Sequence, residues 1–133
     1  VQAGIDVPFV ASDGAFLSAT IDEAEGTAEG MYVSGFAPSP KQAVTDAWIK
    51  RYQAIEYRNP DTYSINGYTA LEVLAEGVKR AETLEASQVS DAIRTSTFET
   101  PMGELAYQPN GDLREATVYI FQVRQGAFEQ VYP

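Results

Sequence analysis

Asp13 carries the first binding chemistry that this sequence suggests. It follows the apolar run Val7–Ala11 and Ser12, and Gly14 comes directly after it. A short apolar run ended by turn-forming residues is typical of a strand buried on both faces, with a loop at its carboxyl end. Open α/β sheets bind ligands at that edge, and Gly14 would allow a sharp turn and the close approach of a ligand. The alternative is that Asp13 only caps a following helix.

Several other chemistries are closed to this chain, because it has no Cys and no His. Thiol nucleophiles, Ser-His triads, the usual zinc sites and imidazole acid–base catalysis all need one of these residues. The segment Asn110–Asp112 lacks the remaining ligand spacing of a calcium loop and is interpreted as a turn. No cofactor and no metal is therefore expected.

Composition indicates one modest globular domain. The chain has 133 residues, of which 44% are hydrophobic, and a formal net charge of −10. That charge argues against nucleic acid and anionic membrane surfaces as partners. No apolar run is long enough to span a bilayer, so no membrane span is expected. The chain opens at Val1 without Met, which we interpret as a segment of a longer protein.

The first third of the chain predicts a strand, a helix and a second strand. After the opening strand, residues 15–25 predict a short helix and residues 31–36 a strand. The breaker at 37–40 favours a crossing between substructures. Ser39 as N-cap, with Pro40 in the first helical position, then predicts a helix that closes at 57–60.

A second long helix is predicted from a cap at Asp61 or Thr62 to Ala81. Its expected buried stripe consists of Tyr68, Leu71, Leu74, Ala75, Val78 and Ala81. The expected wet side carries Glu72, Glu76, Lys79 and Arg80, with Glu76 and Arg80 at pairing distance in sequence. A shorter third helix is predicted from Ser87.

The hydrophobic period changes to two from residue 100 onward. Strands are predicted at 103–107, 116–123 and 127–131, with a tight Asn-Gly turn within 109–112. Three strands in sequence predict an antiparallel meander. The overall class is therefore α/β.

Five short motifs give this pattern a specific resemblance. They are Phe9–Gly14, Ala28–Val33, Tyr68–Leu71, Pro101–Gly103 and Asn110–Leu113. In this order and at these intervals, they resemble the carboxy-terminal third of periplasmic solute-binding proteins of the branched-chain amino acid (leucine/isoleucine/valine-binding) type. The resemblance extends over nearly all of the 133 residues.

The resemblance implies a fragment of a type I periplasmic-binding-protein fold, with strands and helices from two lobes. Proteins of this family are about three times as long and close two α/β lobes on a ligand. Residues 1–36 would be a second-lobe segment, residues 37–103 a helical segment of the first lobe, and residues 104–133 the closing strands of the second lobe.

The resemblance also implies half of a ligand site. Asp13 matches the acid that pairs with the ligand's α-ammonium group, although leucine-type proteins use Glu there. Tyr63 falls where the family often places an aromatic ring against the ligand, the alternative being ordinary packing. Ala15 and Phe16 would line the cleft, and for Phe16 a core position is the alternative. The groups that bind the ligand carboxylate would lie outside this chain.

The implied function is non-catalytic ligand binding in an ABC importer for amino acids or related small molecules. The parent protein would be periplasmic or extracellular and would dock on an ABC permease. One alternative is a ligand-sensing domain of the same fold in a signalling protein. Another is a hydrolytic or transferase domain using Asp13 and Glu104, which the lack of His and of a phosphate loop disfavours. The isolated chain is expected to form a homo-oligomer, because its edges and apolar faces would lack neighbours.

Overall fold

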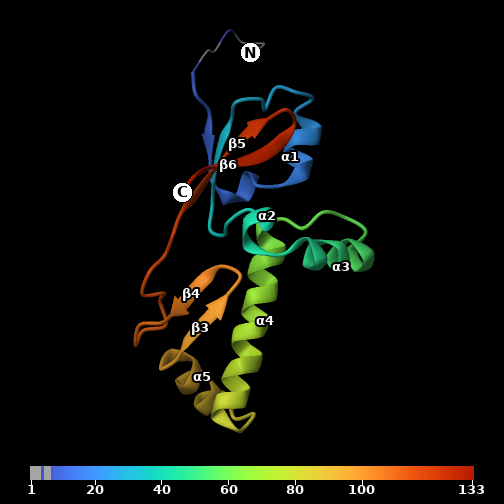
Figure 1. The fold of residues 1–133 in the computed structure, drawn as a ribbon. Helices are drawn as coiled ribbons and strands as arrows, with labels where there is room; N and C mark the ends of the chain where they lie inside the picture. The colour runs from blue at the N-terminus through green and yellow to red at the C-terminus, as the bar shows by residue number, and fades with distance from the viewer. Residues whose placement is uncertain (1–3, 5–6) are drawn as a thin grey trace. The chain divides into compact units, whose positions relative to one another are not determined.

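The computed structural model describes residue 4 and residues 7–133, which form two compact units. The first unit contains the described residues up to Ser39 together with Thr117–Pro133. The second contains Pro40–Ala116. Figure 1 shows the elements of both units, and each unit is described here by itself.

The first unit is built on a four-stranded sheet in the order β1-β2-β5-β6. Its strands are β1 (Val10–Ala11), β2 (Tyr32–Gly35), β5 (Tyr119–Arg124) and β6 (Ala127–Tyr132). Strand β1 runs parallel to β2, and the other two pairs are antiparallel. A 3-10 turn, η1 (Asp13–Ala15), and a short helix, α1 (Ser18–Glu23), connect β1 to β2.

One aromatic cluster forms the core of this unit. The ring of Phe16 meets Phe121 edge-on and stacks on Phe128, with both centroids 4.4 Å away. Val33 and Val123 complete the centre of the cluster. Side chains alternate between the faces of a strand, so these apolar residues point inward from β2 and β5. The cluster holds the β1-to-α1 connection against the sheet through Phe16.

The last two predicted strands, 116–123 and 127–131, correspond to β5 and β6, which are joined by a two-residue hairpin loop. Gln125 and Gly126 both have positive φ, of 51° and 72°. This conformation matches the twist of the paired strands, and glycine adopts it without strain.

The second unit surrounds one long helix. Its elements are α2 (Pro40–Ala43), α3 (Asp46–Glu56), α4 (Thr62–Ala81), α5 (Ala86–Arg94), β3 (Thr97–Thr100) and β4 (Gly103–Ala106). Helix α5 and the β3–β4 hairpin lie along one side of α4 (Figure 1). No helix in the described residues is both long and apolar enough to cross a membrane.

The ends of α4 agree with the sequence prediction. Asp61 is the N-cap, its carboxylate accepts the Ser64 N–H at 2.8 Å, and the Ser64 hydroxyl accepts the Asp61 N–H in return. This reciprocal pair is a capping box. The predicted Glu76–Arg80 pair is also present, with 3.2 Å between carboxylate and Nε.

The predicted buried stripe of α4 is wrong within this chain. The buried residues of α4 are Thr62, Ile65, Thr69, Val73 and Gly77. Val73 packs with Phe98 of β3 and Gly77 lies against Ile93 and Val89 of α5, whereas Leu71 of the predicted stripe is 68% exposed. The helix is apolar on two sides, and the sequence alone does not say which side this chain covers.

The single helix predicted from Ser39 is two helices. Helix α2 ends at Ala43, and α3 begins after a new cap at Thr45, whose hydroxyl accepts the Trp48 N–H at 3.3 Å. Ser39 directly precedes α2, and its N–H donates to Gln130 Oε1 at 2.7 Å in the first unit. The threonine interrupts the helix because it supplies a competing N-terminal cap.

The predicted meander is also wrong, because the strand β3 was not expected. Strand β4 pairs with β3 inside the second unit, and β5 pairs with β2 and β6 in the first. The Asn110–Gly111 turn lies in a loop between them, closed by Gln108 N–H to Asp112 O at 2.7 Å. The chain therefore returns to the first unit at Thr117.

The opening strand is an edge strand, contrary to the prediction that it is buried on both faces. Strand β1 has two residues and pairs only with β2, and Val10 is 69% exposed. Only Ala11 of the two packs against the core cluster of this unit. The predicted strand began at Val7, which lies before β1.

Candidate functional site

The Asp13 turn lies at the carboxyl end of β1. Turn η1 begins two residues after Ala11, and Asp13 is half-buried there. The Ser12 carbonyl accepts the Ala15 N–H at 3.0 Å, and the Asp13 carbonyl accepts the Phe16 N–H at 2.8 Å. These two bonds close the turn and fix the backbone that carries the carboxylate.

Asp13 does not act as a helix N-cap. Ser12 occupies that position before η1, and Leu17 occupies it before α1. The helix-capping alternative is therefore not what the structure contains. A carboxylate at the carboxyl end of a strand is instead in the position where open α/β sheets place ligand-binding groups.

Ala15 and Phe16 attach this turn to the core of the first unit. Phe16 is only 5% exposed, and its ring packs between Phe121 and Phe128. Ala15 packs against the same cluster while half-buried. This burial supports the core interpretation of Phe16. By packing in the core, Phe16 anchors the turn that carries Asp13.

Tyr63 lies in the second unit, in the first turn of α4. Its side chain is 39% exposed, and the capping box of Asp61 and Ser64 fixes the turn around it. The hydroxyls of Tyr52 and Ser64 are 2.8 Å apart, which ties α3 to the same turn. Tyr63 is thus held on a rigid helix end, in a different unit from Asp13.

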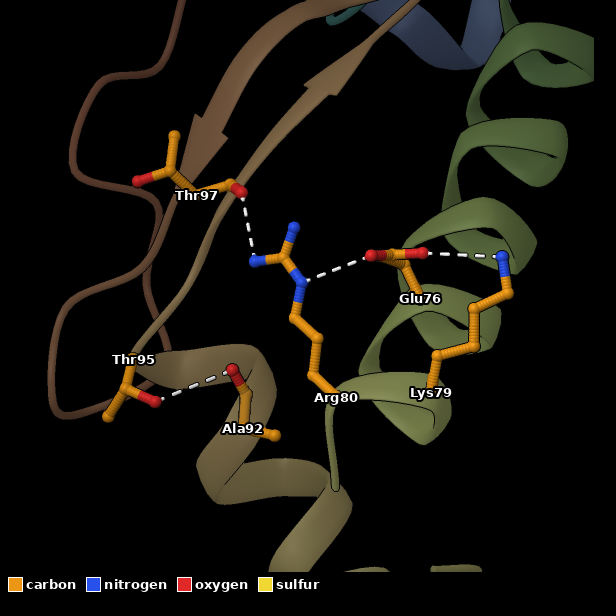
Figure 2. A network of polar contacts seen from close by, with 6 residues as sticks. All are labelled: Glu76, Lys79, Arg80, Ala92, Thr95 and Thr97. Carbon is orange, nitrogen blue, oxygen red and sulfur yellow. Dashed lines mark hydrogen bonds and ion pairs between the residues drawn. The ribbon is translucent and has the colours of Figure 1, made fainter. Parts of the chain in front are cut away.

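A groove between α4 and β3 was not predicted from the sequence. It measures about 440 Å³ and is lined by Glu72, Val73, Ala75, Glu76, Lys79, Arg80, Thr97, Phe98, Glu99 and Thr100. Figure 2 shows Arg80 at its centre, donating to the Glu76 carboxylate and to the Thr97 carbonyl at 3.2 Å each. The Arg80 guanidinium also lies 4.7 Å from the centre of the Phe98 ring.

Glu76 pairs with both basic residues of this groove. Lys79 Nζ lies 3.4 Å from the second carboxylate oxygen of Glu76. The hydrogen bond from Arg80, and to a smaller extent the one from Lys79, lower the pKa of Glu76. Arg80 covers a carbonyl on the outer edge of β3, which protects that edge from further strand pairing. We therefore interpret the network as structural. Of this network, only the Glu76–Arg80 pair could be predicted from the sequence, because its residues are four apart on one helix. Thr97 and Phe98 are in β3, and their contacts with Arg80 depend on tertiary packing.

The first unit is thus a mixed α/β unit, and its carboxylate turn lies at the carboxyl end of a strand, the position where open α/β sheets bind ligands. Comparison with known families makes the assignment specific. The chain belongs to the periplasmic binding protein family, because residues 2–127 match the model of that family.

The curated relatives that match are amino acid-binding proteins by name. The chain is 32% identical over 123 residues to a leucine-, isoleucine-, valine-, threonine- and alanine-binding protein of Pseudomonas aeruginosa. That match covers 89% of this chain and 32% of the relative. The chain thus spans about a third of the length of the curated relatives it matches.

Solved structures show the same fold. A leucine-binding protein from Thermotoga maritima superposes with a TM-score of 0.84 at 24% identity, over 98% of this chain and 38% of that one. A branched-chain amino acid substrate-binding protein from Streptococcus pneumoniae, solved with isoleucine, gives a TM-score of 0.79 at 22% identity, over 99% and 39%. This chain has the fold of part of a type I periplasmic binding protein, as the resemblance implied.

Proposed function

We propose that this chain is the carboxy-terminal part of a solute-binding protein of an ABC importer for amino acids or related small molecules, and that it catalyses no reaction. The observation that carries the proposal is the Asp13 turn, held at the carboxyl end of β1 in a chain of this family. The name of the P. aeruginosa relative supports an amino acid as ligand.

Asp13 would pair with the α-ammonium group of the ligand. A hydrogen bond between a carboxylate and an ammonium group contributes about 1.5–3 kcal/mol when both groups are partly desolvated. The turn that carries Asp13 is closed by backbone bonds and anchored by Phe16, so little conformational entropy would be lost on binding. Ala15 in the same turn and Tyr63 on α4 would supply apolar contacts to the ligand.

The parent protein would work outside the cytoplasm by closing two lobes on the ligand. A ligand that contacts both lobes stabilises the closed state by its differential affinity, and an ABC permease would recognise that state. This chain alone would hold only part of the site, since it spans about a third of the relatives' length. Its own affinity for amino acids is therefore expected to be weaker than micromolar.

The test is binding by a chimera in which this chain replaces the matched region of the P. aeruginosa relative. Calorimetry with a panel of amino acids should detect binding, and Asp13→Ala should weaken it at least tenfold, since about 1.4 kcal/mol corresponds to a factor of ten. Asp22→Ala, in the exposed part of α1, is the matched control and should leave the affinity unchanged. Equal affinities for the Asp13→Ala chimera and the unsubstituted one would contradict the proposal.

A further inference from the structure

The chain contains three asparagines, and two of them precede a glycine. They are Asn59, followed by Pro60, Asn66, followed by Gly67, and Asn110, followed by Gly111. An asparagine loses its side-chain amide when the backbone nitrogen of the next residue attacks Cγ, and a glycine leaves that nitrogen unhindered because it has no side chain. Proline has no N–H, so this reaction is closed to Asn59. The fold then distinguishes Asn66 from Asn110.

Asn66 and Gly67 lie inside α4. In an α-helix, each N–H beyond the first turn donates to the carbonyl four residues before it, so the Gly67 nitrogen is engaged. The Nδ2 atom of Asn66 is buried as well. The reaction at Asn66 therefore requires α4 to unfold locally. Opening a packed helix costs a free energy that approaches that of global unfolding.

Asn110 lies in an exposed turn between β4 and β5. Gly111 is exposed as well, and a Cβ added there would meet no atom within 4 Å. The Gly111 N–H donates to the Gln108 carbonyl at 2.9 Å, and this bond has to open before the nitrogen can react. Exposed loops open at a small cost in free energy. The Gly111 nitrogen is therefore far more accessible to reaction than that of Gly67.

The side-chain amide of Asn110 is polarised by Asp112. Its Oδ1 accepts the Asp112 N–H at 3.1 Å, and its Nδ2 donates to the Asp112 carboxylate at 2.6 Å. Attack on Cγ moves negative charge onto Oδ1, and a backbone N–H that donates to this oxygen stabilises the developing charge. The turn thus supplies a donor at the atom where the reaction needs one.

We propose that Asn110 is a site of spontaneous deamidation, whereas α4 protects Asn66. The Gly111 nitrogen loses its proton to solvent base and forms a bond to Cγ of Asn110. The Cγ–Nδ2 bond then breaks, and Nδ2 takes up a proton from water and leaves as ammonia. Water opens the resulting cyclic imide at either carbonyl, which gives aspartate or isoaspartate. No atom is oxidised or reduced, so water and base are the only reactants.

The modification changes a turn that leads directly into the core of the second unit. Leu113 follows this turn and packs against the buried cluster around Phe98. A new carboxylate at position 110 faces the carboxylate of Asp112, so repulsion between like charges replaces the 2.6 Å hydrogen bond. Isoaspartate also lengthens the backbone by one methylene group. The modified chain is therefore less stable than the original one.

The test is peptide mapping by mass spectrometry after incubation of the 133-residue chain at mildly alkaline pH. One sample stays folded, and the other is kept in concentrated guanidinium chloride. In the folded sample, Asn110 should lose its amide at least tenfold faster than Asn66, and a factor of ten corresponds to about 1.4 kcal/mol of opening free energy. In the denatured sample the two rates should become similar, because both asparagines precede glycine. Asn59 is the internal control and should stay intact in both samples.

Similar rates at Asn66 and Asn110 in the folded chain would overturn the proposal. An Asn110 that stays intact in the folded chain but reacts in the denatured one would overturn it as well, because the turn would then protect its amide. Neither result depends on a substitution or a ligand. The outcome is therefore independent of the proposed function.

A second measurement tests the effect on stability with Asn110→Gln, whose longer side chain closes such a ring more slowly. During the same incubation, the urea midpoint of the unsubstituted chain should fall, and that of Asn110→Gln should stay constant. A midpoint that falls equally in both chains would contradict the role given to Asn110. The peptide map decides the question by itself where Asn110→Gln does not fold.

Discussion

At the scale of single residues, two glycines of α4, of which Gly77 is buried and Gly67 exposed, should respond oppositely to the same substitution. A Cβ at Gly77 would lie 2.4 and 2.8 Å from the Ile93 side chain, whereas at Gly67 it would meet nothing within 4 Å. We expect Gly77→Ala to destabilise the chain by about 1–3 kcal/mol through overpacking. Gly67→Ala should stabilise it by up to about 1 kcal/mol through helix propensity. Urea unfolding of both variants is the measurement, and shifts of the same sign would contradict the packing described here.

Glu76 gives a second prediction at this scale, concerning pH. Hydrogen bonds from Arg80 and Lys79 lower its pKa from the ordinary value of 4.5. A carboxyl with a lowered folded-state pKa stabilises the fold above the unfolded value, and the contribution is lost as the pH falls below it. Glu76→Gln should therefore lower the urea midpoint at pH 7 and have little effect at pH 3. Glu56→Gln, an exposed glutamate outside this network, serves as the control. A deficit of Glu76→Gln that persists undiminished at pH 3 would show that the ion pairs are not its cause.

At the scale of elements, the capping box of α4 should stabilise the fold more than an N-cap residue that makes no side-chain hydrogen bond. The Asp61 carboxylate accepts the Ser64 N–H, whereas Glu85, the N-cap residue of α5, makes no such bond. Asp61→Ala should cost about 1 kcal/mol of stability. Glu85→Ala should change stability by less than about 0.5 kcal/mol. Thermal melting checks both, and equal effects would refute the capping contribution.

The elements also show which features the sequence predicts and which it does not. The cap at Asp61 and the turn at Gln125–Gly126 are local, and both were predicted correctly. The pairing of β5 with β2 depends on contacts across the whole first unit, so the local pattern suggested a meander instead. The covered face of α4 depends on which neighbours are present, and a helix with two apolar faces gives no local signal for that choice.

The candidate site also has one part that the local sequence predicts and one part that it does not. The apolar run, the acid and the glycine at residues 7–14 indicated a strand and a turn, and the structure places Asp13 in such a turn. The burial of Phe16 follows from its contacts with Phe121 and Phe128, about a hundred residues away in sequence. Which groups complete the site lies beyond the reach of local patterns.

At the scale of the whole molecule, we expect the isolated chain to self-associate. Leu71 and Leu74 of α4 are exposed, and in the other unit Val10 on the edge strand β1 is also exposed. Open strand edges and apolar faces favour association with a second copy when their normal cover is absent. Sedimentation velocity at rising concentration should show oligomers, and Leu71→Glu should shift the population toward monomer. Leu84→Glu, beyond the end of α4, is the matched control. A wild-type chain that stays monomeric throughout would contradict this expectation.

The central claim is that the Asp13 carboxylate binds the ammonium group of an amino acid. The most direct measurement compares, by calorimetry, the binding of leucine and of its deaminated analogue 4-methylpentanoate to the chimera with the P. aeruginosa relative, with and without Asp13→Asn. The account predicts that Asp13→Asn weakens leucine binding at least tenfold and leaves the affinity for 4-methylpentanoate unchanged or higher. Equal losses for both ligands, or no loss for leucine, would contradict it.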